Sequence, residues 1–194
     1  MQTITTILTV LALAASTPTT PFVSELWPGE GSPVLVAGAR QLSLRREPSI
    51  NSPANRRLAL KVGNRVQFDQ TRYQTIRSGL FVVQTAMTLS GRKLGSLTYL
   101  SKDKYYSGKF PVQNYQLKSG TKIEFLQYRA EGSCFMRLHN DVVDVKQCPD
   151  LKDRRLRPLR QAEVLWWVRV IVGGKPRGWA VVDGRTLRDS RRES

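Results

Sequence analysis

The chain has 194 residues, of which 40% are hydrophobic and 24% are charged. This composition excludes a disordered chain and suffices for one or two small domains, each with its own core. Lysine and arginine number 31 against 15 acidic residues, which gives a formal net charge of +16. That excess predicts attraction to polyanions such as nucleic acid, anionic lipid, lipopolysaccharide, teichoic acid or an acidic protein. The alternative is a soluble basic protein whose charge serves only solubility.

The N-terminal residues predict export. Residues 1–16 carry no charged side chain, and their apolar run, Ile7 to Ala14, is too short to span a bilayer. We therefore expect a signal peptide over residues 1–16 and a periplasmic or secreted protein. Residues 17–33 contain four of the ten prolines and are expected to form a linker. A retained N-terminus in a basic nucleic-acid-binding protein is the alternative.

Strand patterns begin at residue 34. Residues 40–48 alternate leucine with polar residues, the period of a half-buried strand. Lys61 to Phe68 predicts a glycine turn that leads into a second strand, and a turn at Ser78-Gly79 leads into a third. Lys118 to Phe125 repeats Lys61 to Phe68, with lysine, glycine and phenylalanine identical. This similarity predicts an internal repeat.

Two cysteines flank a predicted hairpin. Cys134 and Cys148 enclose two strand-like runs around an Asn140-Asp141 turn, which would place the cysteines opposite each other. In an oxidising compartment this predicts a disulfide, and two unrelated reduced thiols are the alternative. Cys134 with His139 would suit a small hydrolase only if the thiol were free. One histidine and two cysteines do not complete a zinc site, so we expect no metal. We also expect no cofactor and no catalytic residue.

A basic segment follows the cysteines. Its positive residues are Lys152, Arg154, Arg155, Arg157 and Arg160. Such charge runs usually form solvated loops, and the functional alternative is a contact with an anionic glycopolymer, a lipid surface or DNA. Because no aromatic residues are interleaved with the arginines, stacking on single-stranded nucleic acid is disfavoured.

The C-terminal region predicts a hairpin. Val164 to Val172 is almost entirely β-branched or aromatic, Gly173 to Pro176 supplies the turn, and Trp179 to Val182 returns as a short strand. Residues 190–194 are a charged tail.

Alternation along the first strand of this hairpin assigns its two faces. Trp166, Val168 and Val170 would face the core, whereas Trp167 and Arg169 would flank an outer groove. The alternative is that the N-terminal unit covers Trp167. An aromatic plane beside a guanidinium suits a sugar ring and a carboxylate. Tyr128 is a further candidate contact for the same ligand, and Trp179 is assigned to the core.

The hairpin resembles a known family. Trp167-Val168-Arg169-Val170, the glycine turn and Gly178-Trp179-Ala180-Val181 look like the W-x-x-V…G-W-V hairpin that closes bacterial SH3-like (SH3b) domains. Upstream, L-S-L-R-R-E-P-S over residues 42–49 and L-x-x-G-x-x-V over residues 60–66 resemble the opening of such a domain. The sequence that directly follows this opening departs from the family because it lacks the tryptophan strand.

The resemblance implies a mainly β fold made of two SH3-like small β-barrels in tandem. A degenerate first unit would span residues 34–89, and a second unit, with an inserted cysteine hairpin and a basic loop, residues 90–189. It also implies a non-enzymatic exported binding module of the bacterial cell envelope, which recognises peptidoglycan or an envelope partner protein. A small Cys/His hydrolase and a basic polyanion- or nucleic-acid-binding protein are the alternatives, and export disfavours nucleic acid.

Overall fold

A computed structural model describes residues 21–27, 29, 31–129, 132–148 and 153–193. The expected signal peptide, residues 1–16, lies outside the described residues. The fold is mainly β, as predicted. The elements are β1 (Phe22–Ser24), β2 (Leu35–Ala37), β3 (Gln41–Arg45), β4 (Ala54–Ala59), β5 (Gln67–Arg77), β6 (Gly79–Val83), β7 (Met87–Gly95), β8 (Tyr99–Leu100), α1 (Lys102–Ser107), β9 (Val112–Leu117), β10 (Lys122–Tyr128), β11 (Cys134–Leu138), β12 (Asp141–Val145), β13 (Leu156–Arg160), β14 (Glu163–Val172), β15 (Lys175–Val181), β16 (Leu187–Asp189) and the 3-10 helix η1 (Ser190–Glu193).

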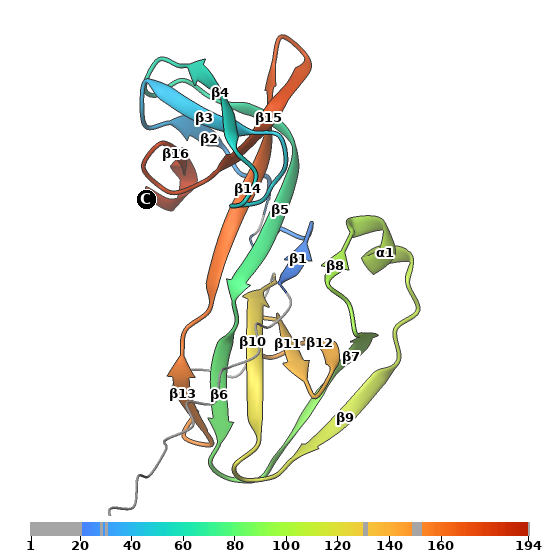
Figure 1. Cartoon of the computed structure of the whole chain (residues 1–194). Coiled ribbons are helices and arrows are strands. Elements are labelled where there is room, and N and C mark those ends of the chain that lie inside the picture. The colour runs from blue at the N-terminus through green and yellow to red at the C-terminus, as the bar shows by residue number, and fades with distance from the viewer. Residues whose placement is uncertain (1–20, 28, 30, 130–131, 149–152, 194) are drawn as a thin grey trace, which may run out of the picture.

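The strands form two large sheets and one small one. The first sheet has the order β4-β3-β15-β14-β5-β1-β8, the second has the order β13-β6-β10-β11-β12-β7-β9, and β16 pairs with β2. Figure 1 shows two lobes joined by the long strands β5 and β14. We call residues 34–77 with 163–189 the first lobe, and residues 79–160 the second lobe.

The two lobes share a strand order. In the first lobe the order is β4-β3-β15-β14-β5, and in the second it is β9-β7-β12-β11-β10. In chain order β3, β4, β5, β14 and β15 correspond to β7, β9, β10, β11 and β12. β2 and β16 correspond to β6 and β13, because each of these two pairs is antiparallel.

The sequence repeat forms the same turn in both lobes. Gly63 and Gly120 both have positive φ, 86° and 84°. The Asn64 amide donates to the carbonyl of Lys61, and the Thr121 amide donates to that of Lys118. Gly63 donates to Ala37 at the end of β2, and Gly120 to Val83 at the end of β6, each at 2.8 Å. The repeated residues therefore occupy equivalent places in the two lobes.

The second lobe is inserted into the first. The chain leaves the first lobe after β5, builds β6 to β13, and returns at β14, which pairs with β5 along most of its length. The boundary expected between residues 89 and 90 falls inside β7. The expected tandem barrels are not confirmed, because β4 and β8 are the unjoined edges of the first sheet and β13 and β9 those of the second.

The C-terminal hairpin forms as predicted, but within the first lobe. Val172 and Lys175 are strand partners, and the two turn residues, Gly173 and Gly174, have φ of 59° and 73°. Two successive positive φ values in a two-residue loop suit the right-handed twist of the flanking strands. Glycine adopts them without steric cost.

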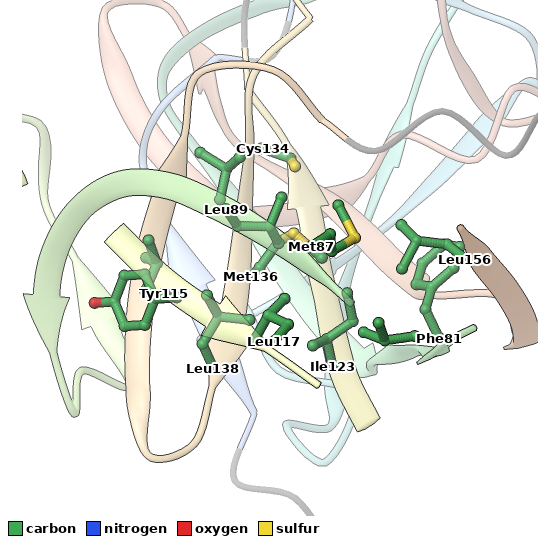
Figure 2. Packing of buried hydrophobic residues seen from close by; sticks show 13 residues of the cluster. Phe81, Met87, Leu89, Tyr115, Leu117, Ile123, Cys134, Met136, Leu138 and Leu156 are labelled. Carbon is green, nitrogen blue, oxygen red and sulfur yellow. The ribbon is translucent and has the colours of Figure 1, made fainter. Parts of the chain in front are cut away.

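Each lobe has its own core. The first-lobe core contains Leu42, Leu44, Val168, Val170 and Ala180, covered by side chains of β2 and β16. The second-lobe core lies within the curled second sheet, and Figure 2 shows its side chains converging. They come from β6, β7, β9, β10, β11, β12 and β13.

A third cluster packs β1 against the second lobe. Phe22 of β1 is fully buried among Leu94, Leu100, Leu126 and Phe135. β1 pairs with β5 on one side and with β8 on the other. Within the linker expected over residues 17–33, residues 22–24 are thus a strand whose alternate side chains are buried. Burial of the Phe22 and Leu26 side chains holds this short strand in place.

In the part of the chain that the structure describes, the helices are short. α1 has six residues, with Ser101 as its N-cap, whose hydroxyl accepts a hydrogen bond from the Lys104 amide. Along the described part of the chain, no helix combines the length and the apolar character that crossing a membrane requires.

Candidate functional site

The outer face of the first sheet carries the predicted groove residues. Trp166, Val168 and Val170 pack in the first-lobe core, so Trp167 and Arg169 lie on the opposite face of β14. Residues directly opposite each other in an antiparallel pair share a face. Arg72 is opposite Trp167, and Trp179 is opposite both Arg169 and Arg45. These five side chains therefore form one surface, which we call the β14 face.

Trp167 is a buried member of the β14 face. Its side chain is 1% exposed, and its indole N–H donates to Oε1 of Gln74 at 3.1 Å. With this burial, the ring does not present a plane for a ligand to stack on. Its role in this conformation is to support the side chains around it.

Arg169 is the accessible partner of Trp167. Its side chain is 31% exposed, and its Nε donates to Oδ1 of Asp69 at 2.8 Å. This hydrogen bond from Arg169 holds the pKa of Asp69 below its ordinary value. The pair fixes the guanidinium plane, while part of that plane remains accessible to an acceptor from outside.

The β14 face also contains a cation–π ladder that the sequence did not predict. The Arg72 guanidinium lies 5.0 Å from the Trp179 ring centre and 5.4 Å from the Tyr99 ring centre. Glu25 pairs with Arg72 at 3.8 Å and accepts a hydrogen bond from the Tyr99 hydroxyl. Burial, with the hydrogen bond to Glu25, raises the pKa of Tyr99. Tyr99 is 40% exposed and is the accessible aromatic ring of the ladder.

Trp179 is buried, but not in the core cluster where the sequence placed it. It packs under Arg72 on the β14 face. The sequence missed the ladder because its residues are far apart in the chain: Arg72, Tyr99 and Trp179 come from three strands, and Glu25 directly follows a fourth, β1. Only the strand order brings them together.

Tyr128 lies in the other sheet. It ends β10 of the second lobe, is 56% exposed, and packs edge-on against Phe125 with 4.7 Å between ring centres. The structure brings Trp167 and Arg169 together on one strand and places Tyr128 on a different sheet.

The basic segment is largely a strand rather than the expected loop. Residues 156–160 form β13, an edge strand that pairs with β6. Pro158 suits an edge, since it has no N–H to donate. Arg154 and Arg157 are exposed, and Arg155 pairs with Asp153 at 2.8 Å. Arg160 instead donates from Nε to the carbonyl of Ser78 at 2.9 Å. Lys152 lies outside the described residues.

The cysteine hairpin is β11 and β12, and its cysteines are paired. Cys134 and Cys148 form a disulfide with 5.5 Å between their Cα atoms. The turn lies one residue before the predicted position, at His139 and Asn140, because Leu138 pairs with Asp141. His139 is exposed with φ of 57°. A disulfide sulfur is not the thiolate nucleophile that a Cys/His hydrolase would need.

Among the described residues, the buried charge with the most hydrogen bonds is Asp144 of β12, which is 1% exposed. Its carboxylate accepts hydrogen bonds from Arg92 at 2.6 and 3.0 Å, from the Tyr105 hydroxyl at 2.8 Å and from Arg129 at 3.0 Å. Both guanidiniums also lie over the Tyr105 ring. With this many internal partners the carboxylate has a structural role, holding α1 and the β10–β11 connection against the second sheet.

Among the described residues, no three histidine, cysteine or acidic side chains are grouped to hold a metal ion. Comparisons of the chain with protein-family models, with curated proteins and with solved structures found no match.

Proposed function

We propose that the chain is a non-enzymatic, exported binding protein of the bacterial cell envelope, built from one SH3-like unit nested within another, which recognises peptidoglycan. The observation that carries the proposal is that two sequence patterns that lie far apart in the chain form neighbouring strands of one sheet. The family-like opening lies in β3 and the turn before β5, and the family-like closing hairpin is β14 and β15. β15 pairs with β3 and β14 pairs with β5 in a single sheet.

This pairing accounts for the departure seen in the sequence. The expected tryptophan strand is missing after residue 66 because the second lobe interrupts the pattern. The strand follows later in the chain as β14. The shared strand order supports a second unit of the same kind, with β11 and β12 in place of β14 and β15.

The β14 face is the proposed binding surface. The net charge of +16 would attract the anionic wall over a distance, as electrostatic steering does. At short range Arg169 would hold a carboxylate and Tyr99 would stack on a sugar ring. Trp167 and Trp179 would support these two side chains from below.

The test is co-sedimentation of the mature protein with protein-free peptidoglycan sacculi at low and at roughly physiological salt. The variant is Arg169→Ala with Tyr99→Ala. The matched control is Lys175→Ala with Tyr106→Ala, which likewise removes one positive charge and one tyrosine, from exposed positions outside the β14 face. We expect binding that survives physiological salt, is lost in the variant and persists in the control.

Other results would contradict the proposal in distinct ways. Binding that disappears with salt equally in all three proteins would indicate general polyanion attraction. No binding at any salt would indicate an envelope protein as the partner. An intact mass without the two-hydrogen deficit of a disulfide would reopen the hydrolase alternative.

A further inference from the structure

The second sheet has an unfilled strand position. β12 pairs with β7 from Gly95 to Gly91, and the ladder ends where Gly91 meets Val145. β7 continues to Met87, paired with β9 alone. On the side where β12 ran, no strand among the described residues pairs with residues 87–90, which therefore form a free edge of the sheet as described.

The backbone groups at this edge can be assigned from the register. The Lys93 amide donates to the carbonyl of Pro111 across the β7–β9 pair, which continues without a bulge to Met87. Backbone groups of successive residues point to opposite sides of a strand. Leu89 and Met87 thus point toward β9 as Lys93 does, whereas Thr88 and Ser90 point to the other side. There the Ser90 carbonyl faces the Lys146 amide, next to the last pair of Gly91 and Val145. The N–H and C=O groups of Thr88 and the N–H group of Ser90 point to the free edge.

A cavity of about 470 Å³ lies along the edge. Its apolar lining includes Met87, Leu89 and Val145, all of which are buried. The Cys134–Cys148 disulfide anchors the connection that follows β12, and Cys148 also lines the cavity.

Positive charge lines the same cavity. Lys146 is exposed, and among the described residues it has no ion-pair partner. Arg155 is held by Asp153, so that these two charges balance and Lys146 remains in excess. Arg92 also lines the cavity, where it is paired with Asp144. The chemistry of the slot is therefore two backbone donors, one backbone acceptor, an apolar floor and the unpaired cation of Lys146.

We propose that an extended, carboxylate-bearing segment of a partner protein binds here as an added strand along β7. A polypeptide backbone matches the alternating donors and acceptors of Thr88 and Ser90, whereas a lipid chain would leave them unpaired. Alternate side chains of the segment enter the apolar floor, and a carboxylate meets Lys146. This site lies in the second lobe, away from the β14 face, and does not rest on recognition of peptidoglycan.

The test uses the whole mature protein and a library of random hexapeptides with free C-termini. The selection is repeated on Lys146→Glu and on the matched control Lys175→Glu, an equal charge reversal at an exposed residue of the other lobe. We expect acidic peptides with alternating apolar residues to be enriched on the wild type and on the control. Their affinity should fall about tenfold or more in Lys146→Glu, as loss of a charge-assisted contact predicts.

Hydrogen exchange then locates the peptide. An enriched peptide should slow exchange of the Thr88 and Ser90 amides and leave that of Leu89, which already faces β9, nearly unchanged. The proposal is overturned by a library that yields no enrichment, by equal affinity for Lys146→Glu and the wild type, or by protection elsewhere. Displacement of the peptide by soluble muropeptides would assign the slot to the cell wall instead of a protein. Sacculus binding tests the β14 face separately.

Discussion

Replacing Asp144 by alanine should be among the most destabilising single changes in the second lobe. The substitution removes four charge-assisted or hydroxyl hydrogen bonds and leaves the Arg92 and Arg129 guanidiniums without their carboxylate. Breaking a buried ion pair by removing one partner costs about 3–5 kcal/mol. The two arginine side chains are 31% and 24% exposed, so water would partly solvate them. We therefore expect the lower end, about 3 kcal/mol.

Thermal and urea unfolding would measure this cost. For a protein of this size, about 3 kcal/mol corresponds to a Tm lower by roughly 6–12 °C. Asp153→Ala is the matched control, because Asp153 also pairs with an arginine, but Arg155 is 56% exposed. Its cost should stay below about 1 kcal/mol. Adding Arg92→Met and Arg129→Met to Asp144→Ala should recover part of the loss, since no charge is then left unpaired.

The reasoning fails if the free energy of unfolding of Asp144→Ala lies within about 1 kcal/mol of that of the wild type. It also fails if Asp153→Ala is equally costly. Either result would mean that water solvates the two guanidiniums as well as the carboxylate does.

Two further predictions follow from the nested topology and from the acidic residues. Arg77 and Glu163 are strand partners, so the dipeptide Asn-Gly, which suits a two-residue hairpin, can connect them directly. A chain of residues 32–193 in which Asn-Gly replaces residues 78–162 should therefore fold as a separate first lobe. Residues 34–89 alone, which lack β14 and β15, should not fold. Circular dichroism and cooperative thermal unfolding would measure both, and a folded 34–89 fragment would contradict the nested arrangement. Burial opposes ionisation of Asp183, but hydrogen bonds from the Arg185, Thr186 and Leu187 amides and the Thr186 hydroxyl outweigh it, so its pKa lies below the ordinary 3.8. Its stabilising effect is therefore complete above the unfolded-state pKa and is lost as the pH falls through the folded-state pKa. Asp183→Asn should flatten the decline of urea stability below about pH 5, and an unchanged decline would rule out this contribution.

Local patterns determined much of the secondary structure. Alternation in residues 40–48 and 164–172 predicted β3 and the two faces of β14, because side chains in a strand alternate regardless of the partner strands. Gly173 and Gly174 predicted the hairpin turn, since their positive φ is a property of the turn itself. The Cys134–Cys148 pairing was predictable for the same reason, as the hairpin between them is local in the chain.

Only the tertiary structure decided which strands share a sheet. The sequence placed the tryptophan hairpin in the second unit by proximity along the chain, whereas it pairs with β5 and β3 across the insertion. It also treated residues 17–33 as a linker, although Phe22 and Leu26 are buried against side chains of the second lobe. The Arg72 ladder, the Asp144 network and the free edge of β7 could not be read from spacing either. Each depends on side chains or backbone groups from several strands, and the sequence does not specify how distant strands are ordered in a sheet.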